Sequence, residues 1–351
     1  MFKAIDKWLI PYLLRKRVRG GTDPHLVISV CDHFEPFHHT DKDGALKRVA
    51  TWDQEFSRIA GEFRDSDGEA PRHTFFYPVE QYDADVVENV AKICRKTGSE
   101  AEIHLHHEND DAESLLALIE QGKRDLVEHG LLSRDQRFAF IHGNWALDNS
   151  HPEGKHCGVS GELEVLRRAG CFADMTMPSA PSPTQTRTIN SIYYATSSPE
   201  PKSHDRGEAA GTSTRGLRDE GNKLLMVQGP LGPNWGWRKF GVLPRVENGD
   251  LTGANPPTES RIGVWRRIGA RIADRPDIIF IKLHTHGAIE RNSAMLLGEP
   301  MRRFHQLLAA SGAKYHYASA REMVNMIHAI EDGETGSPGE FRNHVFQKLT
   351  P

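Results

Sequence analysis

The chain has 351 residues, of which 38% are hydrophobic, enough to bury one large core or two smaller ones. Its formal net charge of -4 gives no reason to expect nucleic-acid binding. The four cysteines are widely spaced and form no CxxC pair, which fits a reducing compartment. There are 19 histidines, and histidine is the commonest metal ligand in proteins.

The N-terminal segment, residues 1–20, is apolar first and basic afterwards. It lacks a secretory cleavage site and is too short and too charged to span a bilayer. One interpretation is a terminal helix packed on the domain; the other is a basic amphipathic segment, residues 1–19, lying on an anionic membrane surface. Pro11 interrupts the apolar face and favours the packed helix. We therefore expect a cytoplasmic protein, with peripheral contact to the inner membrane face as a further hypothesis.

Apolar strand-like runs alternate with helical patterns along most of the chain. The strands are expected at 26–30, 73–77, 102–106, 137–141, 172–177, 192–194, 224–227, 278–283 and 314–317. The helices are expected at 45–63, 84–96, 111–129, 161–169, 259–273 and 320–330. This order predicts an α/β fold with a parallel sheet, either open or closed into a barrel.

One domain is expected over residues 21–332, interrupted by a flexible insertion around 197–257. The first part of the insertion is rich in Pro, Ser, Gly and charge, which is typical of a mobile surface loop. Its second part carries Trp235, Trp237 and Phe240, which would either stack on a sugar ring or cap the domain core. Residues 333–351 are expected to form a loosely ordered C-terminal tail.

Polar residues follow three of the expected strands. His104 and His106 point to the same side of their strand, because strand side chains repeat every two residues. Asp32 and His33 close the first strand, and His284 closes a late one. Functional groups of parallel α/β folds lie at the carboxyl ends of the strands, so these residues predict one shared site.

The chemistry expected of this site is that of a metal-dependent hydrolase. Histidine and carboxylate ligands with an open position can hold a divalent metal that activates water at neutral pH. Asp32 would then serve as the base, and His284 as the acid that protonates the leaving group. A single histidine at a strand end is more often structural, but burying the whole set without a ligand would be costly.

Further polar residues lie in a turn that runs from His142 to Asn149, after the fourth expected strand. Two others lie near later strands. The candidate substrate-binding residues are His142, Asn144, Trp145, Asp148, Asp174 and His286. In the alternative interpretation, Asn144 and Asp148 only hydrogen-bond the backbone of their loop. The chain contains no Walker A, GxSxG, HExxH or strand-linked GxGxxG motif.

At these residues the chain resembles the polysaccharide deacetylase superfamily, carbohydrate esterase family four and its relatives. The segment ending in Asp32-His33 looks like the family's strand ending in two aspartates, a base and a metal ligand, with His33 in the second position. Glu102-Ile103 followed by His106 resembles half of the second motif, in which a further histidine stands four residues later. That position is Asp110, so either Asp110 or His104 would supply the remaining ligand.

The resemblance continues near the C-terminus and spans residues 25–330. Leu283-His284 is similar to the late Leu-His motif whose histidine is the catalytic acid, and 315–323 is similar to the family's last strand and helix. The family's arginine-containing third motif has no clear match, and 142–149 stands in its place.

The resemblance implies a distorted (β/α) barrel that uses a divalent metal, most often zinc, with Co, Mn or Ni as alternatives. The implied reaction removes an N- or O-linked acetyl group from a sugar or surface-glycan precursor. Two other functions stay open: a glycoside hydrolase with Asp32 opposed to Asp148 or Asp174, and a catalytically silent sugar-binding or scaffold protein of a polysaccharide assembly system.

Overall fold

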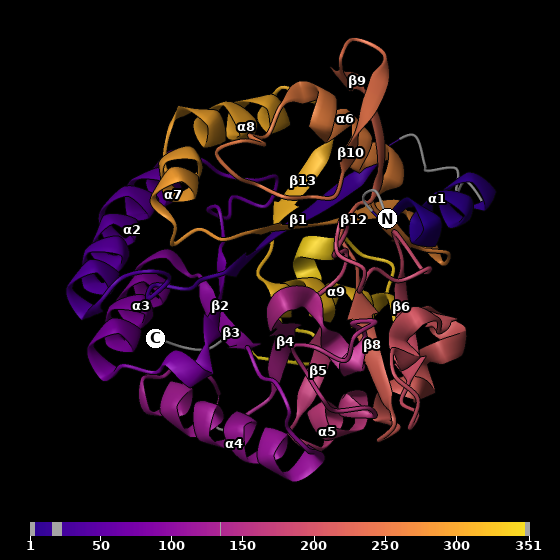
Figure 1. Ribbon diagram of the computed structural model, residues 1–351. Helices are drawn as coiled ribbons and strands as arrows, with labels where there is room; N and C mark the ends of the chain where they lie inside the picture. Colours follow the sequence, from indigo (N-terminus) through magenta and orange to yellow (C-terminus); the bar gives the residue numbers. More distant parts are fainter. Residues whose placement is uncertain (1–3, 16–22, 134, 348–351) are drawn as a thin grey trace.

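The computed structural model describes residues 4–15, 23–133 and 135–347. An eleven-stranded, mostly parallel sheet curls into a nearly closed barrel, and helices pack around its outside (Figure 1). This architecture confirms the α/β fold that the alternation of strands and helices predicts, closed into a barrel as the family resemblance implies. All nine strands expected from the sequence are present, within a few residues of their expected bounds.

Seven neighbouring strands of the barrel run parallel to one another. In sheet order they are β12 (Arg275–Thr285), β1 (His25–His33), β2 (Thr74–Pro78), β3 (Glu100–Leu105), β4 (Phe138–His142), β5 (Cys171–Asp174) and β8 (Lys223–Val227). The other four are β13 (Lys314–Tyr317), parallel to β1, and the antiparallel strands β6 (Ile192–Thr196), β7 (Glu208–Ala209) and β11 (Ala270–Ile272). Parallel order places the carboxyl ends of β1, β3, β4 and β12 at the same end of the barrel.

Helices cover the outside of the sheet. They are α2 (Lys42–Glu62), α3 (Ala84–Thr97), α4 (Ala112–Glu128), α5 (Glu162–Arg168), α6 (Glu259–Ile268), α7 (Glu290–Leu296) and α8 (Glu299–Ala309). The side chains of Asp41, Asp83 and Asp111 accept backbone N–H groups at the starts of α2, α3 and α4. The helix expected over 259–273 ends earlier, because Gly269 turns the backbone to an extended conformation and β11 follows.

The two faces of β1 belong to different cores. Leu26, Ile28 and Val30 pack outward beneath the helices, whereas Val27 and Cys31 belong to the core inside the barrel. This alternation is the two-residue period of a strand, and it decides which later side chains can enter the site.

Helix α9 (Ala320–Glu331) closes the end of the barrel opposite the site (Figure 1, yellow). Every residue of α9 is buried. The Ala320 N–H donates to Oγ1 of Thr74 at the start of β2, 2.9 Å away, and the Arg321 guanidinium lies 3.0 Å from the Glu102 carboxylate inside the barrel. The barrel is therefore filled at its amino end and can be open only at its carboxyl end.

A buried lysine crosses the barrel interior below the site. Lys282 on β12 donates to the carbonyl oxygens of Met175 and Met177, at 2.6 and 2.9 Å. Burial lowers the pKa of Lys282 from its usual 10.5 to about 8. Its ammonium group thus ties β12 to the segment that follows β5.

We expect this lysine to make the free energy of unfolding increase as the pH rises through the mildly alkaline range. Between pH 8 and 10.5 the unfolded chain keeps a proton on Lys282 that the folded protein has lost, so stability increases with pH. Relative to a Lys282→Met variant, the free energy of unfolding should gain about 3 kcal/mol over this interval. Urea unfolding of both proteins across the interval measures the difference; parallel curves would contradict the prediction.

Two ranges expected to be loose contain ordered structure. The range 197–257 includes β8, a central strand of the sheet, and a two-stranded hairpin of β9 (Gly232–Lys239) and β10 (Leu243–Glu247). The tail beyond 333 packs on the barrel as far as Gln347, with the Phe346 and Phe172 rings stacked 4.4 Å apart. The Asn325 side chain donates to the Arg342 and Phe346 carbonyls and so holds this segment against α9.

Helix α1 (Ile5–Leu14) represents the N-terminal segment, of which residues 1–3 and 16–20 lie outside the described part. Its Trp8 and Tyr12 pack against Leu231, Val264 and Ile268, as expected of a helix packed on the domain. Among the described residues, no helix has the length and apolar character needed to cross a membrane.

Candidate functional site

Two histidines and a glutamate converge at the carboxyl end of the barrel. His104 lies near the end of β3, His106 directly after it, and Glu35 just beyond β1. Glu35 Oε1 lies 3.3 Å from Nε2 of His104 and 3.2 Å from Nε2 of His106. The three potential ligand atoms lie within 4.8 Å of one another. The two imidazole centroids are 4.5 Å apart, as the strand period predicts.

Hydrogen bonds on the far side of each ring determine which nitrogen faces Glu35. Nδ1 of His104 lies 2.8 Å from the Ile141 carbonyl oxygen, so it must carry the hydrogen and donate it. Nδ1 of His106 lies 2.7 Å from a Glu80 carboxylate oxygen and donates in the same way. In neutral rings both Nε2 atoms are then bare acceptors facing an acceptor oxygen. A cation between them would turn this repulsion into coordination, and the Glu80–His106 pair is the usual outer support of a metal ligand.

The charges around Glu35 fit the same interpretation. Within the described residues, its only basic partners within 4 Å are His38, His104 and His106. Burial raises the pKa of Glu35, but the neighbouring His104 and His106 rings, which donate to it when protonated, outweigh burial and hold it below its usual value. Burial lowers the pKa of His106, but hydrogen bonds to Glu35 and Glu80 raise it to about 9. Without a metal, a proton on His106 thus occupies the place that a cation would fill.

Other aromatic and imidazole rings surround this trio. The His33 ring centroid lies 4.9 Å from that of His104 and 4.7 Å from that of His286, and the Trp145 ring lies 6.1 Å from His286. The His33 Nε2 atom is buried and has no hydrogen-bond partner. His106, Trp145 and His286 are partly exposed, so the site opens to solvent on their side.

Three of these imidazoles are neutral near pH 7. Burial, and then the neighbouring imidazoles, hold the pKa of His33 well below its usual value. Burial has the same effect on His284, whose Nδ1 is buried without a partner, and on His286. The His284 and His33 ring centroids are 6.3 Å apart. Neutral imidazoles beside the trio can accept or relay a proton.

Asp32, the expected base, points away from the trio. Its Oδ2 lies 2.8 Å from Nε2 of His73, and its Oδ1 accepts the Gly287 N–H at 2.6 Å. Asp32 and His33 are adjacent on one strand, so their side chains must lie on opposite faces, and His33 takes the inner one. Each Asp32 oxygen accepts one of these hydrogen bonds, which together orient the carboxylate toward His73 and Gly287.

Asp110, expected as an alternative ligand beside His106, lies beside a different cluster and contacts one of its histidines. Its Oδ2 is 3.2 Å from Nδ1 of His107. The members of this cluster are His107, His142, Cys157 and Glu162, all buried, with potential ligand atoms within 4.8 Å of one another. His142 was expected to bind substrate, but it closes β4 on the outer face of the barrel and belongs to this group.

The other expected substrate residues have structural roles or stand apart. Asp148 accepts the backbone N–H groups of Gly161 and Glu162 at 2.8 and 3.0 Å, in line with the loop interpretation, and also the Ser203 N–H at 2.6 Å from outside the loop. Asp174 is buried and accepts two hydrogen bonds from Thr176, and burial raises its pKa to about 7. Asn144 is exposed. Of the six expected substrate residues, Trp145 and His286 therefore lie beside the trio.

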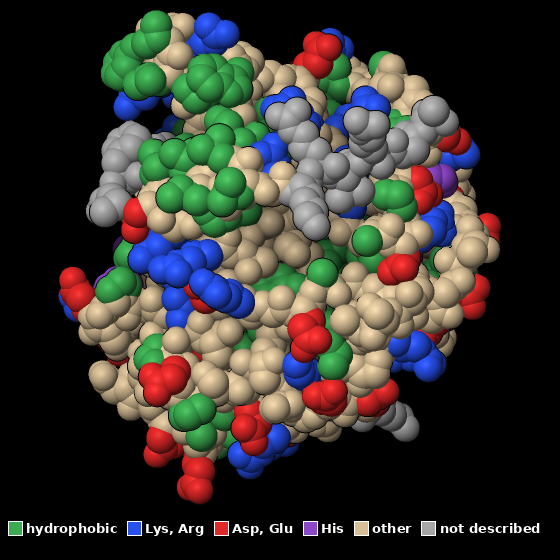
Figure 2. All heavy atoms as spheres, turned by 90° about the vertical axis from the view of Figure 1, so that its right-hand side faces the viewer, with side chains coloured by type: hydrophobic (Ala, Val, Ile, Leu, Met, Phe, Trp, Pro, Cys, Tyr) green, Lys and Arg blue, Asp and Glu red, His purple; other side chains and the backbone are tan. Residues whose placement is uncertain are grey.

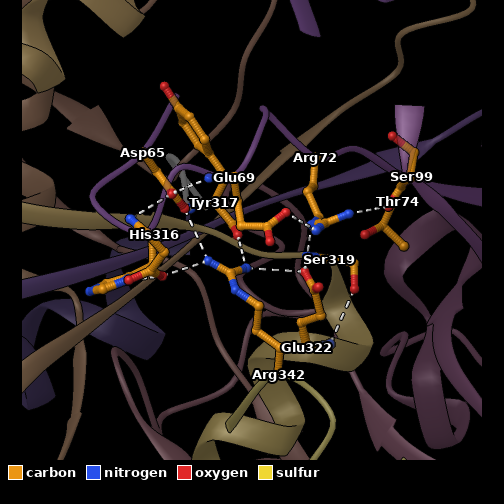
Figure 3. Close-up of polar contacts among 12 residues, drawn as sticks. Asp65, Glu69, Arg72, Thr74, Ser99, His316, Tyr317, Ser319, Glu322 and Arg342 are labelled. Carbon is orange, nitrogen blue, oxygen red and sulfur yellow. Dashed lines mark hydrogen bonds and ion pairs between the residues drawn. The ribbon is translucent and has the colours of Figure 1, made fainter. Parts of the chain in front are cut away.

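A third group with potential ligand atoms, Asp65, Asp67 and His316, already has a cation (Figure 3). The Arg342 guanidinium lies 3.0 Å from Asp65 and 2.9 Å from Asp67, and it also contacts Glu322. Among the described residues, no lysine or arginine pairs in this way with the carboxylates of the other two groups. Those two groups are therefore the candidates for a metal ion.

Sequence reasoning missed Glu35, Glu80, Cys157 and Glu162. Glu35 offered a local signal, because it follows His33 by two residues and can return to the same side of the chain. Glu80, Cys157 and Glu162 gave no local signal. Glu80 lies 26 residues from His106, and Glu162 lies 55 residues from His107, so no short motif links them. The fold alone brings these residues together.

A scan against protein-family models found no match, and a search of curated proteins found none either. The fold and the two uncompensated clusters define an α/β barrel protein with buried histidine, cysteine and carboxylate groups that could hold a metal ion.

Proposed function

We propose that this protein is a metal-dependent hydrolase that removes an acetyl group from a sugar or surface-glycan precursor. The observation that supports it most directly is the convergence of two Nε2 atoms on one Glu35 oxygen at the open end of the barrel. Three protein ligands beside an open position are typical of catalytic zinc sites. The acetyl and sugar specificity rests on the motif resemblance at Asp32-His33, Glu102-Ile103 and Leu283-His284.

In this proposal Glu35, His104 and His106 hold the cation, with zinc favoured and Co, Mn or Ni as alternatives. A divalent cation bound there supplies Lewis acidity toward an acyl oxygen and activates water near neutral pH. Glu80 keeps the proton on Nδ1 of His106, and the Ile141 carbonyl keeps it on Nδ1 of His104. Both rings are thus held with Nε2 toward the site.

The surrounding side chains divide proton transfer and substrate positioning. His33, with its unpartnered Nε2, and the partly exposed His286 are placed to accept a proton and return it to the leaving group. Asp32 holds the Gly287 N–H and so positions the segment that carries His286. Trp145 offers a ring face at the opening, which suits stacking on a sugar.

The glycoside-hydrolase alternative lacks a pair of opposed free carboxylates. Asp32 is bound to His73 and Gly287, and Asp174 to Thr176. Asp148 holds the N-terminus of α5 and the Ser203 N–H. No second function is favoured by the geometry.

Chelation tests the proposed function directly. Dialysis against dipicolinate should abolish acetate release from acetylated chito-oligosaccharides or O-acetylated glycans, and added Zn²⁺, Co²⁺ or Mn²⁺ should restore it, because Glu35 and the two histidines need a cation to act together. Acetate release that survives complete metal removal would refute the proposal. Glycan binding without turnover under any of these metals would point instead to a silent sugar-binding protein.

A further inference from the structure

A second, closed cluster lies on the outer face of the barrel wall. His107 follows β3, His142 ends β4, Cys157 lies in the long loop after β4, and Glu162 begins α5. The residues are 8%, 0%, 0% and 0% exposed, respectively. The neighbouring strand residues His104 and Ile141 point inward, so the sheet separates this cluster from the Glu35 trio.

Both imidazoles of the cluster face the same oxygen of Glu162. His142 Nδ1 lies 2.5 Å from the Gly143 carbonyl and so carries the hydrogen, while its Nε2 lies 3.6 Å from Glu162 Oε1, buried and without a hydrogen-bond partner. His107 Nε2 lies 3.4 Å from that oxygen, and its Nδ1 lies 3.2 Å from Asp110. A neutral His107 carries one ring proton, so it can donate a hydrogen bond to Glu162 or to Asp110 but not to both.

Without a cation Cys157 is a thiol, because burial and the Glu162 carboxylate raise its pKa. Cys157 Sγ accepts the backbone N–H groups of Asn149 and Val159 at 3.3 and 3.4 Å. Its thiol also donates to Oε2 of Glu162, 3.4 Å away. Two N–H donors stabilise a thiolate, but a thiolate beside a buried carboxylate requires a cation.

We infer that His107, His142, Cys157 and Glu162 form a structural zinc site, separate from the proposed hydrolytic centre. Four buried ligands leave no open position, which is the character of structural rather than catalytic zinc sites. A thiolate with imidazoles selects zinc over magnesium or calcium. On binding, the Cys157 thiol releases its proton to solvent, so that the sulfur coordinates as a thiolate. The inference does not depend on the proposed function.

This zinc would hold the loop that supplies Trp145 to the open site. Its ligands His142 and Glu162 stand at the two ends of the loop, and Cys157 stands within it. Several non-glycine residues of the loop have a positive φ: Asn144, Trp145, Asp148, Asn149 and His156. Such conformations persist only where the surroundings hold them, and a metal bound at both ends of the loop provides that constraint.

Sulfur coordination distinguishes this site from the open one, which has no sulfur ligand. Zinc-edge X-ray absorption of the intact wild-type protein should show a sulfur shell at about 2.3 Å. The cobalt-loaded protein should show a thiolate-to-cobalt charge-transfer band in the near ultraviolet. A spectrum with only nitrogen and oxygen ligands, and no such band, would overturn the inference.

Paired variants assign the sulfur. Cys157→Ser should lose the charge-transfer band and one equivalent of zinc, whereas Cys94→Ser, a buried cysteine of α3 outside the cluster, should keep both. Glu35→Gln should keep the band while losing the other equivalent. If Glu35→Gln kept both equivalents and the band, the open site would be wrong and the structural zinc would stand. A band that survives in Cys157→Ser would refute the structural site.

A separate surface feature supports a second inference. Seven of the ten exposed large hydrophobic side chains in the described part of the chain lie on α1 and the β9–β10 hairpin. These seven are Ile10, Leu13, Leu14, Trp235, Phe240, Val242 and Leu243; together they are called the apolar face below. Figure 2 shows hydrophobic side chains gathered near the top of this side of the molecule, with lysine and arginine side chains close by.

Basic residues accompany the apolar face. A hollow of about 1280 Å³ lies between α1, the hairpin and α6, and Arg15, Arg267 and Arg271 are among its lining residues. On the hairpin itself, Arg238 and Lys239 are exposed. Exposed aromatic and aliphatic side chains with flanking cations are the character of a surface that lies in the headgroup region of an anionic bilayer.

We propose that the apolar face binds an anionic membrane surface. The wild-type protein should co-sediment with vesicles of phosphatidylcholine and phosphatidylglycerol, and binding should weaken with salt and with phosphatidylcholine alone. A Phe240→Ser/Leu243→Ser variant should bind at least ~10-fold more weakly, because it removes two inserted side chains. Leu118→Ser, at an exposed leucine of α4, is the matched control.

Two results would overturn the membrane proposal. One is wild-type protein that does not sediment with anionic vesicles at low salt. The other is a stable dimer in sedimentation analysis that the double variant converts to monomer without any change in vesicle binding, since the apolar face would then join two copies of the chain.

Discussion

Replacing Glu35 by glutamine should remove the metal from the open site and abolish most of the hydrolytic activity. The amide has the same shape, but it takes away the negative charge that faces Nε2 of both His104 and His106. We expect metal affinity at this site to fall by about 100-fold or more, because loss of even an outer-shell partner typically costs 10- to 100-fold. Metal content and acetate release, measured on the same preparation, check the prediction.

Two further glutamate variants give the metal affinity and activity losses with which the Glu35→Gln losses are compared. Glu80→Gln should weaken metal binding less than Glu35→Gln does, since Glu80 acts on the cation through His106. Glu113→Gln, at an exposed residue of α4, should change neither property. Equal losses in the Glu35 and Glu80 variants would indicate that protonated His106, rather than a cation, joins the two carboxylates.

Replacing Arg342 by alanine should destabilise the protein by about 3 to 5 kcal/mol, the usual cost of breaking a buried ion pair on one side. Its guanidinium lies against Asp65, Asp67 and Glu322, and it donates to the Tyr317 carbonyl. Without it, the buried Asp65 and the exposed Asp67 have no other arginine or lysine partner among the described residues, while Glu322 keeps Arg72. Urea unfolding followed by circular dichroism measures the loss.

An exposed arginine provides the comparison. Arg215 pairs with Asp332, but its side chain is 59% exposed, so Arg215→Ala should change the free energy of unfolding far less than Arg342→Ala does. If the two variants lost the same stability, the contacts of Arg342 in Figure 3 would not be what stabilises this part of the protein. The contrast also tests how firmly the C-terminal segment is attached to the barrel.

Local periodicity predicted the α/β fold and part of the open site, and the family resemblance implied the barrel. The nine strands could be found because apolar runs end at polar residues, and the shared face of His104 and His106 follows from the two-residue period. The same period argues against a shared face for Asp32 and His33. The expectation that Asp32 and His33 act on one substrate rests on the family resemblance, and it conflicts with this period.

Contacts between residues far apart in the sequence produce the two features that the sequence did not predict, the second cluster and the ordered C-terminal tail. In the sequence His142 looks like a member of the same site as His106. Only the loop that returns Cys157 and Glu162 to the barrel wall places His142 in another cluster, with Asp110 beside it. The tail after 333 looks loose because its composition is polar, yet a few buried side chains, Arg342 and Phe346 among them, attach it. Neither the second cluster nor the packing of the C-terminal tail produces a recognisable pattern within a short window of sequence.

The pairing of β1 has a consequence for synthesis of the chain. β1 is the first strand to be made, yet it pairs with β12 and β13, which come from the last quarter of the sequence. The helix that fills the amino end of the barrel, α9, is made later still. A nascent chain therefore leaves one edge of β1 unpaired until translation is nearly complete, so we expect slow, late closure of the barrel and a need for protection from aggregation on the ribosome.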